Sequence, residues 1–132
     1  MGSFALDVSK FVAKANKNVD TVVRSVSIKL FSAIIKASPV DTGRFRMNWQ
    51  TSGAEERTGL VAGVDPTGGA TINSATTFIT NAPTARQFTL ANNLPYAERL
   101  EYGWSQQAPV GMVRVNVARF QTLIDQEAAK VR

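Results

Sequence analysis

The sequence predicts an α+β domain, and three patterns carry that prediction. The first third of the chain repeats apolar residues at helical spacing, short middle segments alternate polar and apolar residues as strands do, and the last third returns to helical spacing. With 132 residues, 44% of them hydrophobic, the chain fits one domain with its own core. We expect an N-terminal helix within residues 1–38, a sheet within 44–92 and C-terminal helices within 95–132.

A long amphipathic helix is predicted from about residue 5 to residue 37. Its apolar stripe advances in steps of three and four residues through Val8, Phe11, Ala15, Val19, Val22, Val26, Leu30 and then Ala33 or Ile34. Ser3 or Asp7 is the candidate N-cap, and Pro39 ends the helix because proline disfavours helical backbone at the residue before it. At 1.5 Å per residue the helix would be about 50 Å long, so part of it must project or pack on another molecule.

A turn follows the helix. We predict Pro39, Asp41, Thr42 and Gly43 as its structural residues, because Asp41 can accept backbone N–H bonds and Gly43 can adopt a positive φ. Residues 44–50 then alternate polar and apolar side chains, which favours a strand, although a short helical turn capped by Asp41 before the strand fits equally well.

The rest of the predicted sheet is small and mostly antiparallel. Thr58–Val64 is predicted as a second strand and Phe88–Asn92 as the last one. Between them, residues 65–87 are rich in Gly, Thr, Ser and Asn, with Thr76–Thr80 as their one strand-like run. We expect this segment to form an extended loop, an arm or a hairpin.

Helices are predicted for the last part of the chain. Residues 95–103 fit a short helix that begins at Pro95 and ends at Gly103. Val113, Val115 and Val117 alternate as in a strand, but Pro109 is a good helix start and the apolar spacing continues to Val131. We therefore favour one helix over about 110–130.

The composition excludes several kinds of chemistry. The chain has no Cys and no His, so disulfides, thiolate nucleophiles, Cys or His zinc sites and Ser-His-Asp catalysis are ruled out. Asp41-Thr42-Gly43 is the tripeptide of aspartic proteases, but a second copy is missing and a turn is the commoner use. Glu98 and Glu101 share a helix face without the His of a metal motif. We expect no enzyme, no cofactor and no metal.

The net charge of +5 is concentrated in the first third, where residues 1–40 hold six cations and two anions. Such a segment could bind nucleic acid through the first helix, although a solvated helix face is the simpler interpretation. The sequence shows neither a signal-peptide pattern nor an apolar run long enough to span a membrane, so we expect synthesis in the cytoplasm and no membrane contact.

Aromatic and charged side chains near the predicted turns are candidates for an interface with a partner. Trp, Tyr and Arg are enriched in such interfaces, although aromatic residues also pin loops to a core. The candidates are Arg44, Arg46, Trp49, Phe78, Ile79, Tyr96, Glu98, Glu101, Tyr102 and Trp104.

Two segments resemble motifs of one protein family. Residues 38–46, Ser-Pro-Val-Asp-Thr-Gly-Arg-Phe-Arg, followed by Trp49, resemble the PVDTG-R-L-R segment of the head–tail joining proteins of siphophages, which are called neck, tail-completion or tail-terminator proteins. Residues 93–105 resemble the Y-A-x-x-x-E-x-G segment of that family, and Gln107-Ala108-Pro109 resembles its proline before the last helix. Two motifs in the right order are a fairly specific signal.

The resemblance implies a structural virion protein without catalysis, made in the bacterial host. It implies a homo-oligomeric ring, typically a hexamer, that ends or completes the tail and joins it to the capsid connector. Its expected partners are connector or head-completion proteins and the tail tube protein, with genomic DNA passing through the ring lumen. Residues 65–87 are longer than the family's minimal form and are expected to contact a neighbouring subunit or ring.

Overall fold

A computed structural model describes residues 4–7, 19–85, 87–103, 105–108 and 110–119, with single positions at 122, 125, 126 and 129. The described elements follow the order β1 (Phe4–Asp7), α2 (Val19–Ala37), α3 (Arg44–Met47), β2 (Trp49–Ser52), α4 (Gly69–Asn81), β3 (Thr89–Asn92), α5 (Ala97–Glu101) and α6 (Val113–Val117). The strands form one sheet in the order β1-β3-β2, with both neighbours antiparallel to β3. The prediction of an α+β chain with a small antiparallel sheet is confirmed.

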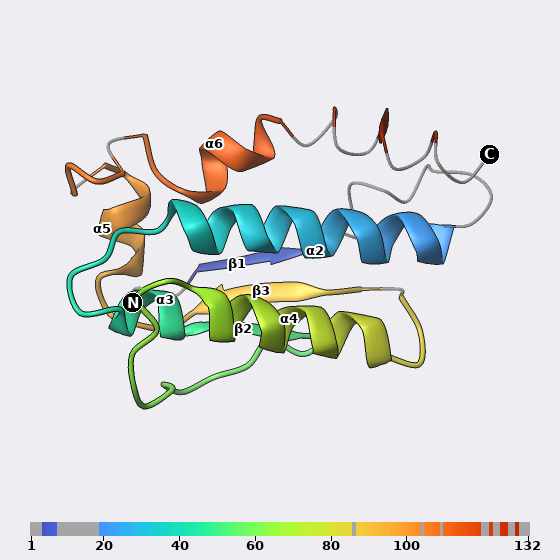
Figure 1. Cartoon of the computed structure of the whole chain (residues 1–132), viewed down its shortest axis with the longest axis horizontal. Coiled ribbons are helices and arrows are strands. Elements are labelled where there is room, and N and C mark those ends of the chain that lie inside the picture. Colours follow the sequence, from blue (N-terminus) through green and yellow to red (C-terminus); the bar gives the residue numbers. More distant parts are fainter. Residues whose placement is uncertain are drawn as a thin grey trace.

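Two long helices cover one face of this sheet. In Figure 1, α2 and α4 run side by side in front of the strands, α6 lies against α2, and α3 and α5 lie together at one end. The register places Trp49 opposite Asn92 and Thr51 opposite Leu90, so these four residues share a face. Trp49 and Leu90 belong to the same buried cluster as the apolar residues of α2, and this cluster is the core.

The first helix is shorter than predicted and does not begin near residue 5. Residues 4–7 instead pair with β3, from Phe4 opposite Asn92 to Asp7 opposite Thr89, and this ladder excludes helical backbone there. The 19 residues of α2 span about 28 Å, which fits a domain of this size. The predicted end at Ala37 is confirmed, whereas Val8, Phe11 and Ala15 of the predicted stripe lie outside the described residues.

The segment after the turn is first helical and then extended. The helical alternative is correct for Arg44–Met47, and the strand starts only at Trp49. Asn48 separates the two elements, and its backbone N–H bonds to the carbonyl oxygens of Arg44 and Phe45 close the helix.

The largest correction concerns residues 65–87, where the predicted loop, arm or hairpin is wrong. Thirteen of these residues form the helix α4. Thr71, Ala75 and Ile79 are buried at steps of four, and Ile72 and Phe78 pack partly against the core. Burial of this stripe outweighs the low helix propensity of Gly, Thr, Ser and Asn.

The predicted strand over Thr58–Val64 is also absent from the structure, which describes this whole segment as a loop. Its backbone is bonded to side-chain amides, because the Asn48 Oδ1 atom accepts the N–H of Val61 at 2.8 Å and the Gln50 Nε2 atom donates to the carbonyl of Gly59 at 2.9 Å. The segment therefore runs beside the Asn48–Gln50 stretch without joining a backbone ladder.

The last strand and the last described helices agree better with the elements predicted from the sequence. β3 matches the predicted final strand and is buried along its whole length, as a central strand should be. α5 lies within the predicted helix at 95–103, and α6 shows that the valines at 113, 115 and 117 are helical. Most of the predicted helix beyond Arg119 lies outside the described residues.

Candidate functional site

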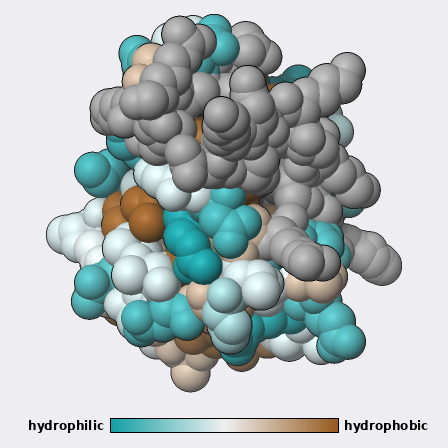
Figure 2. Space-filling model, turned by 90° about the vertical axis from the view of Figure 1, so that its right-hand side faces the viewer, coloured by the Kyte–Doolittle hydropathy of each residue, from teal (hydrophilic) through white to brown (hydrophobic). Residues whose placement is uncertain are grey.

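A cleft of about 480 Å³ opens at the end of the molecule where α3 and α5 lie. One wall is formed by residues 39–45 of the turn, and the other by Tyr96, Leu100, Ser105 and Gln107. The two sequence segments singled out by their motifs are therefore brought together, although about fifty residues separate them. The opposite end of the molecule, shown in Figure 2, is mostly hydrophilic to neutral where described residues are visible.

The turn depends on Gly43 more than on Asp41. Gly43 has a φ of 100°, and a Cβ atom there would lie 2.5 Å from the backbone nitrogen of Pro66, so a larger residue does not fit. Gly43 is also the N-cap of α3, and the first N–H, that of Arg44, donates to the Thr42 Oγ1 atom at 3.2 Å. The N-cap of α3 is Gly43 and no side-chain cap bond is present at that position, so the hypothesis that Asp41 caps this helix is wrong.

Contacts across the cleft join its two walls. The Gln107 amide makes two bonds with the backbone of Val40, donating to its carbonyl and accepting its N–H, both at 2.8 Å. The Tyr96 ring lies 6.0 Å from the Phe45 ring between centroids, and Phe45 in turn meets Trp49 edge-on at 5.7 Å. The cleft therefore has an aromatic floor and a preformed shape. Gln107 and Phe45 were missed as site residues, although both lie within the quoted motifs.

Glu101 has a structural role inside the chain. Its side chain is 1% exposed, and its carboxylate accepts the backbone N–H groups of Met112, Val113 and Arg114 at 2.7–2.9 Å. The Arg114 Nε atom adds an ion pair at 3.1 Å. At Gly111, which has a φ of 84°, a Cβ atom would overlap the Glu101 carbonyl oxygen. Glu101 thus fastens the first turn of α6 to α5.

Several other predicted interface residues form contacts inside the chain's own fold. Trp49 is buried and donates from Nε1 to the Ser38 Oγ atom at 2.9 Å, and Ile79 is fully buried in the core. The Arg46 guanidinium donates to backbone carbonyls of Lys36, Ser38 and Pro66. The expectation that the side chains of Trp49, Ile79 and Glu101 face a partner is corrected by this burial. Phe78 is half-buried against Phe88.

The remaining candidates are on the surface. Arg44 and Glu98 are exposed, and Tyr102 is 67% exposed with the Arg114 guanidinium 4.7 Å from its ring centroid. Tyr96 is half-buried in the cleft. The predicted pair of Glu98 and Glu101 is therefore split between surface and interior. Trp104 lies outside the described residues.

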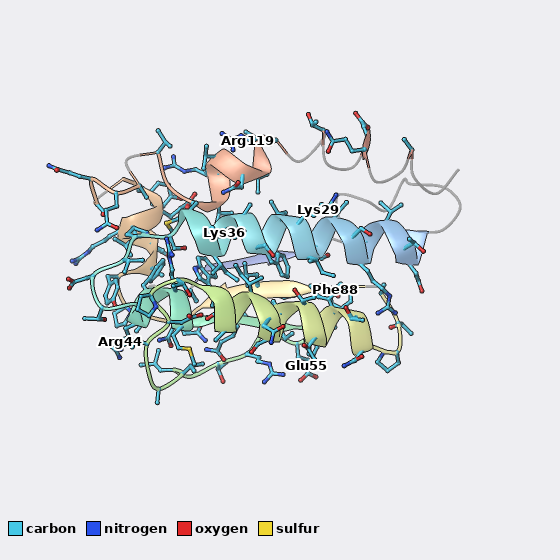
Figure 3. The ribbon with its side chains drawn as sticks, viewed as in Figure 1. Lys29, Lys36, Arg44, Glu55, Phe88 and Arg119 are labelled. Atoms are coloured by element: carbon cyan, nitrogen blue, oxygen red, sulfur yellow. The ribbon has the colours of Figure 1, made fainter. Side chains whose placement is uncertain are left out.

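The cations of the first helix are partly used within the fold. Arg24 donates to the carbonyls of Ile79 at 2.6 Å and Ala82 at 2.9 Å, where it satisfies the C-terminal end of α4. Figure 3 places Lys29 and Lys36 along the same helix, both exposed. Lys10, Lys14 and Lys17 lie outside the described residues.

Among the described residues, no three acidic side chains gather in a way that could hold a metal ion. The helices of the described part are all too short or too polar to cross a membrane. In comparisons with known proteins, no family model, no curated protein and no solved structure matches the chain.

Proposed function

We propose that this chain is a structural subunit of the phage head–tail junction. In this proposal it assembles into a ring, most simply a hexamer, which ends or completes the tail and joins it to the capsid connector. Catalysis plays no part in this function. The chain would reside in the virion after synthesis in the bacterial host, with connector and tail tube proteins as its partners.

One observation carries the proposal: the two segments that resemble the phage family line a single cleft. Three of their residues have clear physical reasons to be where they are, because Gly43 permits the close approach of Pro66, Tyr96 covers Phe45, and Glu101 holds α6. Because the two motif segments line the same cleft, one shared surface explains them better than two loops with unrelated roles. The lack of Cys and His fits a protein whose work is docking.

The proposal predicts a discrete ring in solution. Mass photometry of the purified chain over rising concentration should show one species of about six subunits, because a head-to-tail contact whose rotation closes generates a ring of fixed size. Negative-stain images should show a central hole. Only monomers at every concentration, together with no binding to the connector and tail tube proteins encoded near its gene, would contradict the proposal.

A further inference from the structure

A second cavity, of about 270 Å³, lies between β2, α4 and the loop that joins them (residues 53–68). From β2 it is lined by three consecutive residues, Trp49, Gln50 and Thr51. Because successive side chains of a strand point to opposite faces of its sheet, a cavity that touches three in a row lies along the edge of the strand. We call it the edge groove, and Figure 1 shows α4 running along the same strand.

The edge of β2 beside this groove is an outer edge of the sheet. Among the described strands, β2 pairs with β3 alone. In an antiparallel ladder, alternate residues of an outer strand turn their N–H and C=O groups away from the sheet. The loop approaches β2 only through the side-chain amides of Asn48 and Gln50, which bind its backbone at Val61 and Gly59. These amides space the loop from the strand, and the edge groove lies between the two.

The walls of the edge groove combine small residues with uncovered apolar surface. On the α4 wall, Ala70 and Ser74 are small and exposed, one helical turn apart. Met47, Val61 and Phe78 also line the groove, and each of them is only half-buried by its own chain. The groove therefore keeps apolar surface that a partner side chain can cover.

Charge contributes little to this groove. α4 and β2 contain no charged residue, and of the described residues that line the groove only Arg57 is charged. The Arg57 guanidinium lies 5.8 Å from the Phe78 ring centroid, and Glu55 and Glu56 precede it on the loop. Because these loop charges are mixed, the groove selects by shape and by backbone pairing.

We propose that the edge groove binds an extended segment of a partner protein, which adds to β2 as a fourth strand. The outward N–H and C=O groups of β2 pair with the segment, and its alternate side chains, which are apolar, enter the cavity between Val61 and Phe78. At about 3.3 Å per residue, the four residues of β2 span about 13 Å, so about four partner residues are paired.

The shape of the groove also fixes the kind of strand that can enter. α4 lies on one side of the edge and the loop on the other, so a single extended chain fits between them and the edge of a second folded sheet does not. The edge groove and the cleft share no lining residue, and this inference does not depend on ring assembly.

Hydrogen exchange of the isotope-labelled chain, measured by NMR, tests strand addition directly. The probes are short peptides of the pattern Ser-Thr-X-Ser-X-Thr-Ser, in which X is Val, Leu, Ile or Phe. The peptide that binds best should slow the exchange of alternate β2 amides at least tenfold, whereas the amides between them, which already bond to β3, should stay unchanged. If no peptide of this set protects any β2 amide, the proposal is overturned.

Two variants and a blocked peptide distinguish strand addition from simple apolar binding. Ser74→Trp fills the groove from an exposed position and should weaken peptide binding at least tenfold, whereas Thr77→Trp, exposed on α4 outside the groove lining, should leave it unchanged. N-methylation of every second peptide residue removes the donors of one peptide edge, so one of the two alternate patterns should abolish binding and the other should retain it. Equal binding of both methylated peptides, or equal effects of both Trp variants, would overturn the proposal and leave the proposed ring standing.

Discussion

At the scale of the residue, the buried carboxylate of Glu101 gives a physical reason for the glutamate of the Y-A-x-x-x-E-x-G segment. Glu101 is surrounded by donors, because the backbone N–H groups of Met112, Val113 and Arg114 at the start of α6 and the Arg114 guanidinium all point to its two oxygens. A carboxylate supplies acceptors only, so no other side chain of this length serves all these donors. The same helix carries Glu98 on its exposed side. Two glutamates three positions apart therefore have different roles.

Glu101→Gln should lower the free energy of unfolding by about 2–3 kcal/mol, as expected for a lost charged and buried hydrogen-bond acceptor. The amide NH₂ of Gln would face the N–H groups of Arg114 and leave donors unpaired. Urea unfolding followed by circular dichroism measures the change, and Glu98→Gln is the matched control, expected within about 0.5 kcal/mol of the parent. Equal stability of the two variants would remove this role from Glu101.

At the scale of the element, α4 shows where sequence reasoning succeeds and fails. The prediction for α2 relied on a strong apolar stripe before a proline, and its C-terminal half is correct. In α4 the stripe of Thr71, Ala75 and Ile79 was obscured by a composition typical of loops, and a run of threonines suggested a strand. Packing against α2 and β2 decides the outcome, and a local sequence pattern does not contain that packing.

The start of α4 is stabilised by Asp65, which sequence reasoning assigned to a loop. Its buried carboxylate accepts the N–H of Thr71 at 2.7 Å, while Gly68 takes the N-cap position without a side chain. Burial by itself raises the pKa of Asp65, but hydrogen bonds from the Thr71 side chain and from the N–H groups of Thr71, Ala70 and Gly68 outweigh it. The pKa of this carboxyl is thus lowered from 3.8.

The lowered pKa gives Asp65 a defined effect on acid stability. Since the folded-state pKa lies below the unfolded value, the carboxylate stabilises the fold above pH 3.8, and this contribution is lost as the pH falls through the folded pKa. Asp65→Asn should lower the free energy of unfolding by about 1 kcal/mol at neutral pH, as for a lost helix cap. It should also make the melting temperature fall less steeply as the pH is lowered into the acid range. Melting temperatures of the variant and the parent from pH 7 to pH 3 test this. An equally steep fall of the melting temperature in both proteins would contradict it.

At the scale of the whole molecule, the sequence indicated a basic protein, and several of the described arginines contact other groups of the fold. Arg24 and Arg46 donate to backbone carbonyls at helix ends, Arg114 pairs with Glu101, and the Arg57 guanidinium lies 5.8 Å from the Phe78 ring centroid. Such arrangements join distant segments and leave no periodic signal in a sequence. The cleft was unpredictable for the same reason, since its two walls meet only through tertiary packing.

This use of arginine bears on duplex DNA as an alternative partner. Arg24 and Arg46 are already bonded to backbone carbonyls, so these two guanidinium groups should release few counterions, whereas Arg44 is exposed and available to phosphate. We expect the isolated chain to bind a random duplex no tighter than about 10 μM at physiological salt, with a plot of log K against log salt no steeper than about −3. Fluorescence anisotropy across a salt series measures both quantities, with Lys29→Gln plus Lys36→Gln as a paired variant on the exposed side of α2. Submicromolar binding with a slope near −6 or steeper would favour the nucleic-acid alternative. If the paired variant also removed that binding, the interaction would be assigned to α2.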